Sequence, residues 1–453
     1  MSTARVWWWL LLSTLLLVGL PGLALADTAL DHGAGALERG PAPLGIRLEF
    51  VLFALTLLGV ALFHHHTLYV ALGGLAAVLT LKLTLVENFD LLARVHHEWP
   101  IILNLLGLLV GFAILAKHFE ESRIPQWLPA ILPDDWKGGL VLLGIVFVLS
   151  SFLDNIAAAM IGGEMARVLY KNRVHVGFLA AIVAASNAGG AGSVVGDTTT
   201  TMIWLAGISP LEVAEAALGA AAAIAVCGSL AAWQQQRFQP IVKDAPVGLT
   251  IDWARLVIVG LVLAGAIGAN LAWGVPAAGV WAAILLGIPL RRPDWHVIPG
   301  ALKGAAFLLA LVSCAALMPV DTLPTPSWGT TLGLGFVSAV FDNIPLTKLA
   351  IAQGGYDWGF LAYAVGFGGS MMWFGSSAGV ALSTIFPQTR STGRWLRFGW
   401  HVIPAYVVGF LTMLLVVGWH VPGTPTASGQ PAAAVGTAQV GSVAAPGRTR
   451  PHH

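Results

Sequence analysis

Three aspartates stand inside segments that are otherwise apolar. Asp154 and Asp342 each begin an Asp-Asn-Ile triplet, and Asp197 stands in the run GSVVGDTTTT. Placing an ionised side chain near the middle of a bilayer costs about 2.5 to 3.5 kcal/mol of free energy on insertion scales. We therefore treat each of these aspartates as a candidate functional residue. Carboxylate, amide and hydroxyl oxygens together suit Na⁺ or H⁺ and disfavour soft metals. We therefore expect an ion-binding site, with Na⁺ at Asp154, Asp197 and Asp342.

Neutral oxygen donors surround these carboxylates. Asn155 and Asn343 follow directly after two of them and complete the expected set of ion ligands. The supporting residues are Ser186, Asn187, Ser193, Thr198, Thr199, Ser370, Ser376, Ser377 and Lys348. A structural role is open for all of them, because Asp and Asn favour helix caps and Ser and Thr bond back to their own helix. Lys348 is expected either to reach the outer surface or to pair with Asp342 or Asp197.

The composition places this site in a membrane. Of the 453 residues, 57% are apolar and only 10% are charged, and the mean hydropathy is +0.79. We therefore predict an all-α polytopic membrane protein whose partners are the lipid bilayer and a monovalent cation. A net charge of +1 without a clustered basic face excludes a nucleic-acid partner. No phosphate-binding GxxxxGK[ST] loop occurs, so we expect no cofactor, only Na⁺ and H⁺ as transported ions.

The apolar segments divide the chain into parts. Plain spanning helices are expected at 46–63, 68–86, 99–118, 211–232, 253–273, 276–290, 298–320 and 399–419. The parts are a signal peptide (1–26, alternatively an uncleaved helix), N-terminal transmembrane helices (27–137), a first repeat core (138–232), linking scaffold helices (253–320), a second repeat core (329–419) and a disordered tail (422–453). Each core begins with a hairpin, at 138–163 and 329–353, and continues with a broken helix, at 176–208 and 359–386.

An internal repeat supports this division. The segment FLDNIAAA at 152–159 is echoed by VFDNIPLT at 340–347, and in both halves a Gly-Gly pair is followed six positions later by another glycine. If the first hairpin opens to the cytoplasm and the second to the outside, Lys and Arg concentrate in the cytoplasmic loops, such as those after 118, 232 and 290. The loops after 86, 208, 273, 320 and 353 are then external. This order predicts an inverted-repeat transporter with two re-entrant hairpins and two broken transmembrane helices.

The segments SNAGGAGSVVGDTTTTMIW, SAVFDNIPLTKLAIAQGGY and FLAYAVGFGGSMMWFGSSAGVA resemble the signature segments of NhaD-type sodium/proton antiporters. That family belongs to the ion transporter superfamily, which also holds arsenite permeases and citrate carriers. The resemblance implies a homodimer in the bacterial inner (plasma) membrane, an elevator-like motion, and exchange of cytoplasmic Na⁺ or Li⁺ for external H⁺. It also implies ion binding at Asp154, Asn155, Asp197, Asp342 and Asn343. Lys348 departs from the family pattern, which favours a small apolar residue there.

Two other functions remain open at this point. The first is a Na⁺- or H⁺-coupled carrier of citrate, dicarboxylates or arsenite from the same superfamily, which needs cations or helix dipoles that face the substrate. The second is a membrane-embedded enzyme that uses the aspartates for proteolysis. That function would leave the duplicated glycine-broken helices unexplained. We expect a transporter and not an enzyme.

Overall fold

The computed structural model describes residues 47–63, 66–86, 89–127, 132–242, 250–320 and 323–421, and every regular element in them is helical. The predicted signal segment, 1–26, and the predicted tail, 422–453, lie outside these residues.

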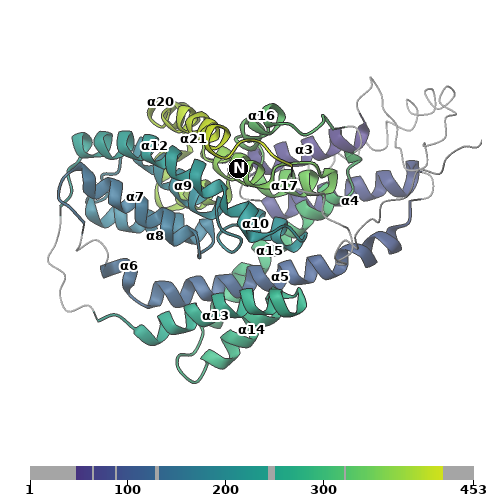
Figure 1. Cartoon of the computed structure of the whole chain (residues 1–453), viewed down its shortest axis with the longest axis horizontal. Coiled ribbons are helices and arrows are strands. Elements are labelled where there is room, and N and C mark those ends of the chain that lie inside the picture. The colour runs from purple at the N-terminus through teal and green to yellow at the C-terminus, as the bar shows by residue number, and fades with distance from the viewer. Residues whose placement is uncertain are drawn as a thin grey trace, which may run out of the picture.

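A long helix organises one side of the molecule. Helix α5 (Leu91–Glu121) begins at Asp90, whose carboxylate accepts hydrogen bonds from the first-turn amides of Leu92 and Ala93. It runs along the lower part of Figure 1 and packs on α13 (Trp253–Trp273) and α14 (Pro276–Gly287). The structure therefore extends the predicted span 99–118 by two turns at its N-terminal end.

The N-terminal helices lie at one end of the molecule. Helices α3 (Leu48–Leu62) and α4 (Thr67–Leu85) pack on each other, and α4 packs on α15 (Ile298–Ala316), as the right half of Figure 1 shows. Together they bury an apolar cluster that includes Leu81 and Leu311.

Five helices in the described residues are long and apolar enough to cross a membrane, or six if the bent pair α20 (Thr392–Phe398) and α21 (Val402–Val416) forms one span. An all-helical fold of this kind is that of a polytopic membrane protein. Two predicted spans need correction. Segment 276–290 forms only the 12-residue α14, which at 1.5 Å per residue is about 18 Å long. Segment 46–63 likewise forms only the 15-residue α3. Segment 399–419 contains α21, and the 56° bend to α20 lies at its N-terminal end.

Four pairs of short helices form the centre of the molecule, and a non-helical break separates the members of each pair. The breaks coincide with the Asp-Asn-Ile triplets and the glycine-rich runs. The first hairpin continues beyond the predicted residue 163 because its second helix extends to Leu169. The pairs are α7 (Trp136–Ser150) with α8 (Asn155–Leu169), α9 (Val176–Ala191) with α10 (Thr198–Leu205), α16 (Trp328–Ser338) with α17 (Asn343–Gln353), and α18 (Trp358–Gly368) with α19 (Ser377–Ile385).

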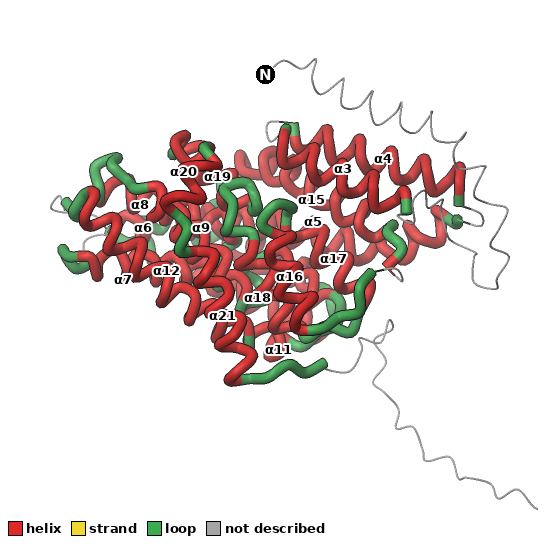
Figure 2. The backbone as a smooth tube through the Cα atoms, turned by 90° about the horizontal axis from the view of Figure 1, so that it is seen from above, coloured by secondary structure: helices red, strands yellow, loops and turns green. Residues whose placement is uncertain are grey.

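Helices α9 and α18 are buried on all sides. A helix that is apolar all round requires other helices to cover it, and α12 (Ala216–Phe238) and α21 do so. In the view of Figure 2, α16, α18 and α21 lie next to one another. Helices α12 and α21 touch through glycines, since a Cβ on Gly219 would lie 2.9 Å from the carbonyl oxygen of Gly409. Small residues at such crossings are typical of packing in membranes.

Several ion pairs join the ends of helices that are far apart in the sequence. On the face predicted to be cytoplasmic, Arg255 pairs with Glu121 at 2.6 Å and Arg291 pairs with Asp252 at 2.7 Å. On the face predicted to be external, Asp357 meets His420 at 3.3 Å. In each of these pairs, both residues belong to loops that the distribution of Lys and Arg places on the same side of the membrane.

Candidate functional site

Each of the three aspartates caps a helix that starts in the middle of the molecule. Asp154 accepts a hydrogen bond from Ile156 N at the start of α8, and Asp342 accepts one from Ile344 N at the start of α17. Asp197 caps α10 in the same way through Thr199 N. The structural role is thus confirmed for all three. Because the N-terminal end of a helix carries a partial positive charge, the caps also bring three carboxylates to favourable positions.

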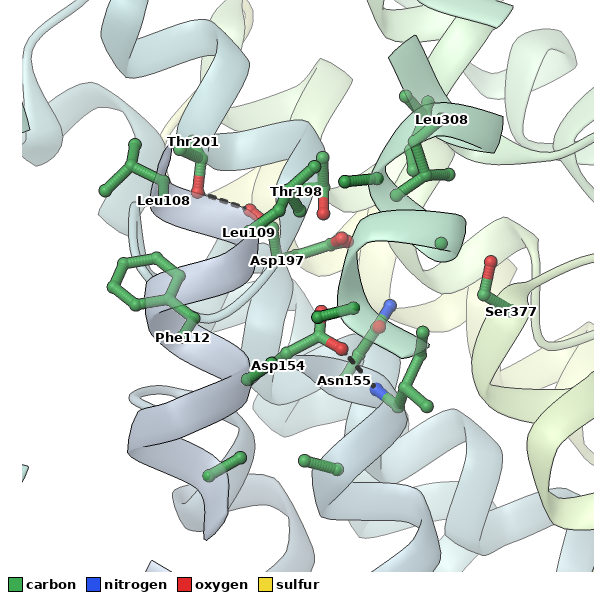
Figure 3. Close-up of a pocket in the computed structure, with 18 of the residues that line it drawn as sticks. Leu108, Leu109, Phe112, Asp154, Asn155, Asp197, Thr198, Thr201, Leu308 and Ser377 are labelled. Atoms are coloured by element: carbon green, nitrogen blue, oxygen red, sulfur yellow. Dashed lines mark hydrogen bonds between the residues drawn. The ribbon is translucent and has the colours of Figure 1, made fainter. Parts of the chain in front are cut away.

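Asp154 and Asp197 line one cavity of about 350 Å³. Both side chains project toward its middle in Figure 3, from opposite sides. Its other polar lining residues are Asn155, Thr198, Thr201, Asn343 and Ser377. Apolar side chains of α5 and α15, such as Phe112 and Leu308, close the far wall. The pocket therefore exposes a small group of oxygens and amides to an otherwise apolar space, with no Lys or Arg among its lining residues.

Asp342 does not line that cavity. It lines a second cavity of about 270 Å³, together with Phe374 and Ser376 and with residues of α3 and α15. Ser377 lines both cavities and donates to Asp342 Oδ2 at 3.2 Å. The two cavities adjoin, because Ile156, Gly304, Leu308 and Ser377 line both of them, so Asp342 lies next to the site of the other two aspartates.

Asp197 is the best-connected carboxylate of the three. Its Oδ2 accepts hydrogen bonds from Asn343 Nδ2 at 3.2 Å and from Thr199 Oγ1 at 2.9 Å. Asn343 belongs to α17 and Asp197 to the start of α10, so this contact joins the second hairpin to the first broken helix. Asp154 receives no side-chain hydrogen bond from the residues that the structure describes, which leaves its carboxylate available to a ligand in the cavity.

Asn187 connects the two halves behind the cavity. Its Nδ2 donates to Ser370 Oγ and Ser376 Oγ, both at 3.0 Å, and its Oδ1 accepts from Asn155 Nδ2 at 3.1 Å. All four residues are buried. A buried polar network with every member paired holds its side chains in fixed positions, so Asn155 is oriented by the break between α18 and α19.

Threonines secure the break between α9 and α10. Thr200 Oγ1 donates to Ser193 O at 2.6 Å, and Thr201 Oγ1 donates to Val194 O at 2.9 Å. These hydroxyls satisfy carbonyls that the interrupted helix leaves without partners, as burial requires. Sequence reasoning did not select Thr200 and Thr201, although the GDTTTT run contained the signal: a run of hydroxyls directly after a predicted break.

The remaining supporting residues have smaller roles. Ser186 Oγ donates to Val183 O in its own helix, which is the structural role expected for a hydroxyl. Ser193 Oγ accepts from Val195 N within the break. Thr198 lines the first cavity, whereas Ser376 caps α19 by accepting from Gly379 N.

Lys348 has a partner that the sequence did not indicate. Its Nζ lies 2.8 Å from Glu98 Oε2, and both side chains are nearly buried, at 10% and 13% exposure. Both expectations for Lys348 were therefore wrong: it neither reaches the outer surface nor pairs with Asp342 or Asp197. Glu98 was missed because it stands in the polar segment HHEWP, directly before the predicted span 99–118. The structure joins it to α5 and places it against the second hairpin.

No protein-family model matches this chain. Two plant proteins are similar to it. Sodium/proton antiporter 1 of Arabidopsis thaliana is 27% identical over 345 residues, which cover 66% of this chain and 58% of that protein. Sodium/proton antiporter 2 of Arabidopsis thaliana is 27% identical over 334 residues, which cover 62% of this chain and 76% of that protein. The match with the first relative thus spans less than two thirds of that protein's length.

Proposed function

We propose that the chain is a secondary active transporter, not an enzyme, that exchanges Na⁺ or Li⁺ for H⁺. The observation that carries the proposal is the cavity that Asp154 and Asp197 share, with only oxygen and amide groups as polar lining. An oxygen-only ligand set suits a hard monovalent cation or a proton. The printed names of the two similar plant proteins support the same function.

The two ions compete for the same carboxylates in this mechanism. When Asp154 and Asp197 are ionised, they bind the cation together with the amide oxygen of Asn155 and the hydroxyl of Thr198. When they take up protons on the other side of the membrane, the cation leaves. Exchange follows because both ions need the same oxygens, so no separate coupling device is required. Asp342 takes part from the second cavity, through Ser377.

The proposed architecture is an inverted repeat of a re-entrant hairpin and a broken helix. Contacts at matching positions support the repeat. Ser150 Oγ donates to Ser186 O, and Ser338 Oγ donates to Val365 O. Ser338 follows Ser150 by the same interval that separates Asp342 from Asp154. In this proposal α7–α8 and α16–α17 are the hairpins and α9–α10 and α18–α19 the broken helices. They move together, in an elevator-like way, against a scaffold that includes α5, α13 and α14.

The NhaD type, the homodimer and the bacterial inner membrane also belong to the proposal. They follow from the resemblance of the signature segments and not from the two relatives, which are plant proteins.

A direct test uses the full-length protein in proteoliposomes that contain a pH-sensitive dye. We expect a Na⁺ or Li⁺ gradient to drive proton movement in the wild type, and Asp197→Asn and Asp154→Asn to reduce it to the rate of empty liposomes. Asp135→Asn is the matched control, since Asp135 caps α7 through Lys137 N but lies on the surface. Wild-type exchange in Asp197→Asn would overturn the assignment of this residue.

The organic-anion carrier is the main rival, and the site argues against it. A dianion needs cationic partners, whereas neither described cavity at the aspartates has a Lys or Arg in its lining. Lys348 is already paired with Glu98. Uptake of labelled citrate or succinate in the same proteoliposomes, without cation-driven proton movement, would favour the carrier.

A further inference from the structure

Three ligand-bearing side chains meet on the face predicted to be external, away from both cavities. Glu215, Asp357 and His420 each offer one potential metal-binding atom, and these atoms lie within 4.8 Å of one another. Each ring nitrogen of His420 lies near a carboxylate. Nδ1 is 3.3 Å from Asp357 Oδ2, and Nε2 is 3.7 Å from Glu215 Oε2. Neither the proposed exchange nor the sequence analysis uses this cluster.

Three separate elements supply the cluster. Glu215 stands between α11 (Pro210–Ala214) and α12, Asp357 caps α18, and His420 follows the end of α21. Gly359 permits their close approach, since a Cβ there would lie 2.9 Å from Glu215 Cβ and 2.8 Å from Glu212 O. Any larger residue at position 359 would push Glu215 away from α18.

The carboxylates are held in place before any ligand binds. Asp357 is only 1% exposed, and its oxygens accept hydrogen bonds from Phe360 N and His420 N. Glu215 Oε2 is inaccessible to solvent and has no hydrogen-bond partner among the described residues. A buried carboxylate oxygen without a hydrogen bond costs free energy, and His420 Nε2, 3.7 Å away, is too distant to supply one. Glu212 adds a third negative charge nearby, close enough for Glu215 and Asp357 to repel it.

We propose that Glu215, Asp357 and His420 bind one divalent transition-metal ion of the Zn²⁺ type. One imidazole nitrogen and two carboxylate oxygens form a three-ligand set that Zn²⁺ accepts, with solvent in the remaining position. The ion offsets the excess of negative charge and satisfies Glu215 Oε2. It also cross-links the ends of α12, α18 and α21. The site is independent of the proposed exchange, because none of its ligands lines either cavity.

The test is Zn²⁺ binding to the full-length protein in detergent, measured by equilibrium dialysis. The chain also has a histidine-rich segment, His64–His66, so the measurements use a background in which these three residues are Ala and any affinity tag is free of histidine. We expect this background protein to bind one Zn²⁺ per chain more than the same protein with His420→Ala or Glu215→Gln. The matched control is His296→Ala, which removes an exposed histidine on the opposite face and should leave Zn²⁺ binding unchanged.

A second measurement separates loss of the site from misfolding. With EDTA present, the melting temperature of each protein gives its own baseline, because His420→Ala also removes the contact with Asp357. Zn²⁺ should then raise the melting temperature of the background protein alone, because a ligand that binds only the folded state stabilises it. Mg²⁺ should not replace Zn²⁺, since it prefers all-oxygen octahedral sites. Equal Zn²⁺ binding with and without His420, or no Zn²⁺-dependent rise, would overturn the proposal, whatever the transport assays show.

Discussion

The two Asp-Asn halves of the molecule share a backbone plan but differ in charge. In the first half, a Cβ on Gly189 would lie 2.0 Å from the Phe147 carbonyl oxygen. In the second, a Cβ on Gly368 would lie 2.3 Å from the Gly335 carbonyl oxygen. Gly335 follows Phe147 by the same interval that separates the two Asp-Asn pairs. The repeat thus preserves the close contact of a hairpin with a glycine-rich helix.

The two halves differ at a helix cap and at a position in the hairpin. Asp197 and Ser376 each follow the glycine that lies six positions after the Gly-Gly pair, and each caps a helix, α10 and α19 respectively. One is a carboxylate and the other a hydroxyl. Lys348, in the second hairpin, occupies the position that Met160 holds in the first when the Asp-Asn pairs are aligned. The two halves thus offer similar helix ends, and in the proposed mechanism the ion chemistry comes from the residues that differ between them.

The largest expected effect comes from making the two halves alike at Asp197. Asp197→Ser gives α10 the cap residue that α19 already has, so helix α10 keeps its N-terminal hydrogen bond. It removes the carboxylate that Asn343 and Thr199 orient. We expect cation-driven proton movement in proteoliposomes to fall to background while the protein still folds.

The reverse change is the control for Asp197→Ser. The double variant Asp197→Ser with Ser376→Asp has as many carboxylates as the wild type, but one of them is moved from position 197 to position 376. Transport should remain absent, because Asn187 and not Asn343 is the neighbour of residue 376. Recovery of transport in this double variant would show that the two positions are interchangeable and would contradict the asymmetric site.

Much of the central arrangement could be predicted from the sequence. The Asp-Asn-Ile triplets and the Gly-Gly pairs marked all four breaks, because charged and amide side chains in apolar segments and adjacent glycines both interrupt a membrane helix. The helix caps at Asp154, Asp197 and Asp342 follow from local chain chemistry alone.

The partners could not be predicted, because they depend on contacts over long intervals. Nothing local to Lys348 indicates that Glu98, 250 residues away, lies beside it. The position of Asp342 in a cavity that adjoins that of the other aspartates depends on the packing around Ser377, which no periodicity encodes. Helix α14 was predicted too long because hydrophobicity continues past the residue at which the chain turns.

The second largest effect is expected at the buried ion pair that distinguishes the hairpins. Lys348→Met gives the second hairpin the residue of the first but leaves Glu98 as a nearly buried charge without its partner. Breaking one side of a buried pair costs about 3–5 kcal/mol, so we expect a clear drop in the melting temperature in detergent. Lys348→Met with Glu98→Gln removes both charges and should recover most of the loss. An equally low melting temperature in the double variant would mean that Lys348 acts through packing alone.

A smaller and symmetrical effect is expected at the glycines that the halves share. Gly189→Ala and Gly368→Ala each place a methyl group against a backbone carbonyl of the neighbouring hairpin, and neither carbonyl can rotate away. Overpacking of this kind costs about 1–3 kcal/mol. Gly144→Ala and Gly333→Ala are the controls, because a Cβ at either position meets nothing within 4 Å. Thermal unfolding should show similar losses at 189 and 368 and none at 144 and 333. A loss in only one half would show that the close contact is not shared.

The smallest effect is expected at the ion pair of Asp252 with Arg291, which belongs to neither half. Its effect on the melting temperature gives a baseline for the other variants. The hydrogen bond from Arg291 holds the pKa of Asp252 below its ordinary value of 3.8. A lowered pKa in the folded state means that the ionised form stabilises the fold. The contribution of the ionised carboxylate to stability is complete above about pH 5 and declines as the pH falls through 3.8 toward the lower pKa of the folded state.

Because such surface pairs contribute at most about 1 kcal/mol to stability, Asp252→Asn should lower the melting temperature slightly at pH 7. The difference from wild type should shrink as the pH falls below 4. A difference that stayed constant down to pH 3 would contradict a role of the Asp252 charge, since Asn can still accept the cap hydrogen bond from Ala254 N.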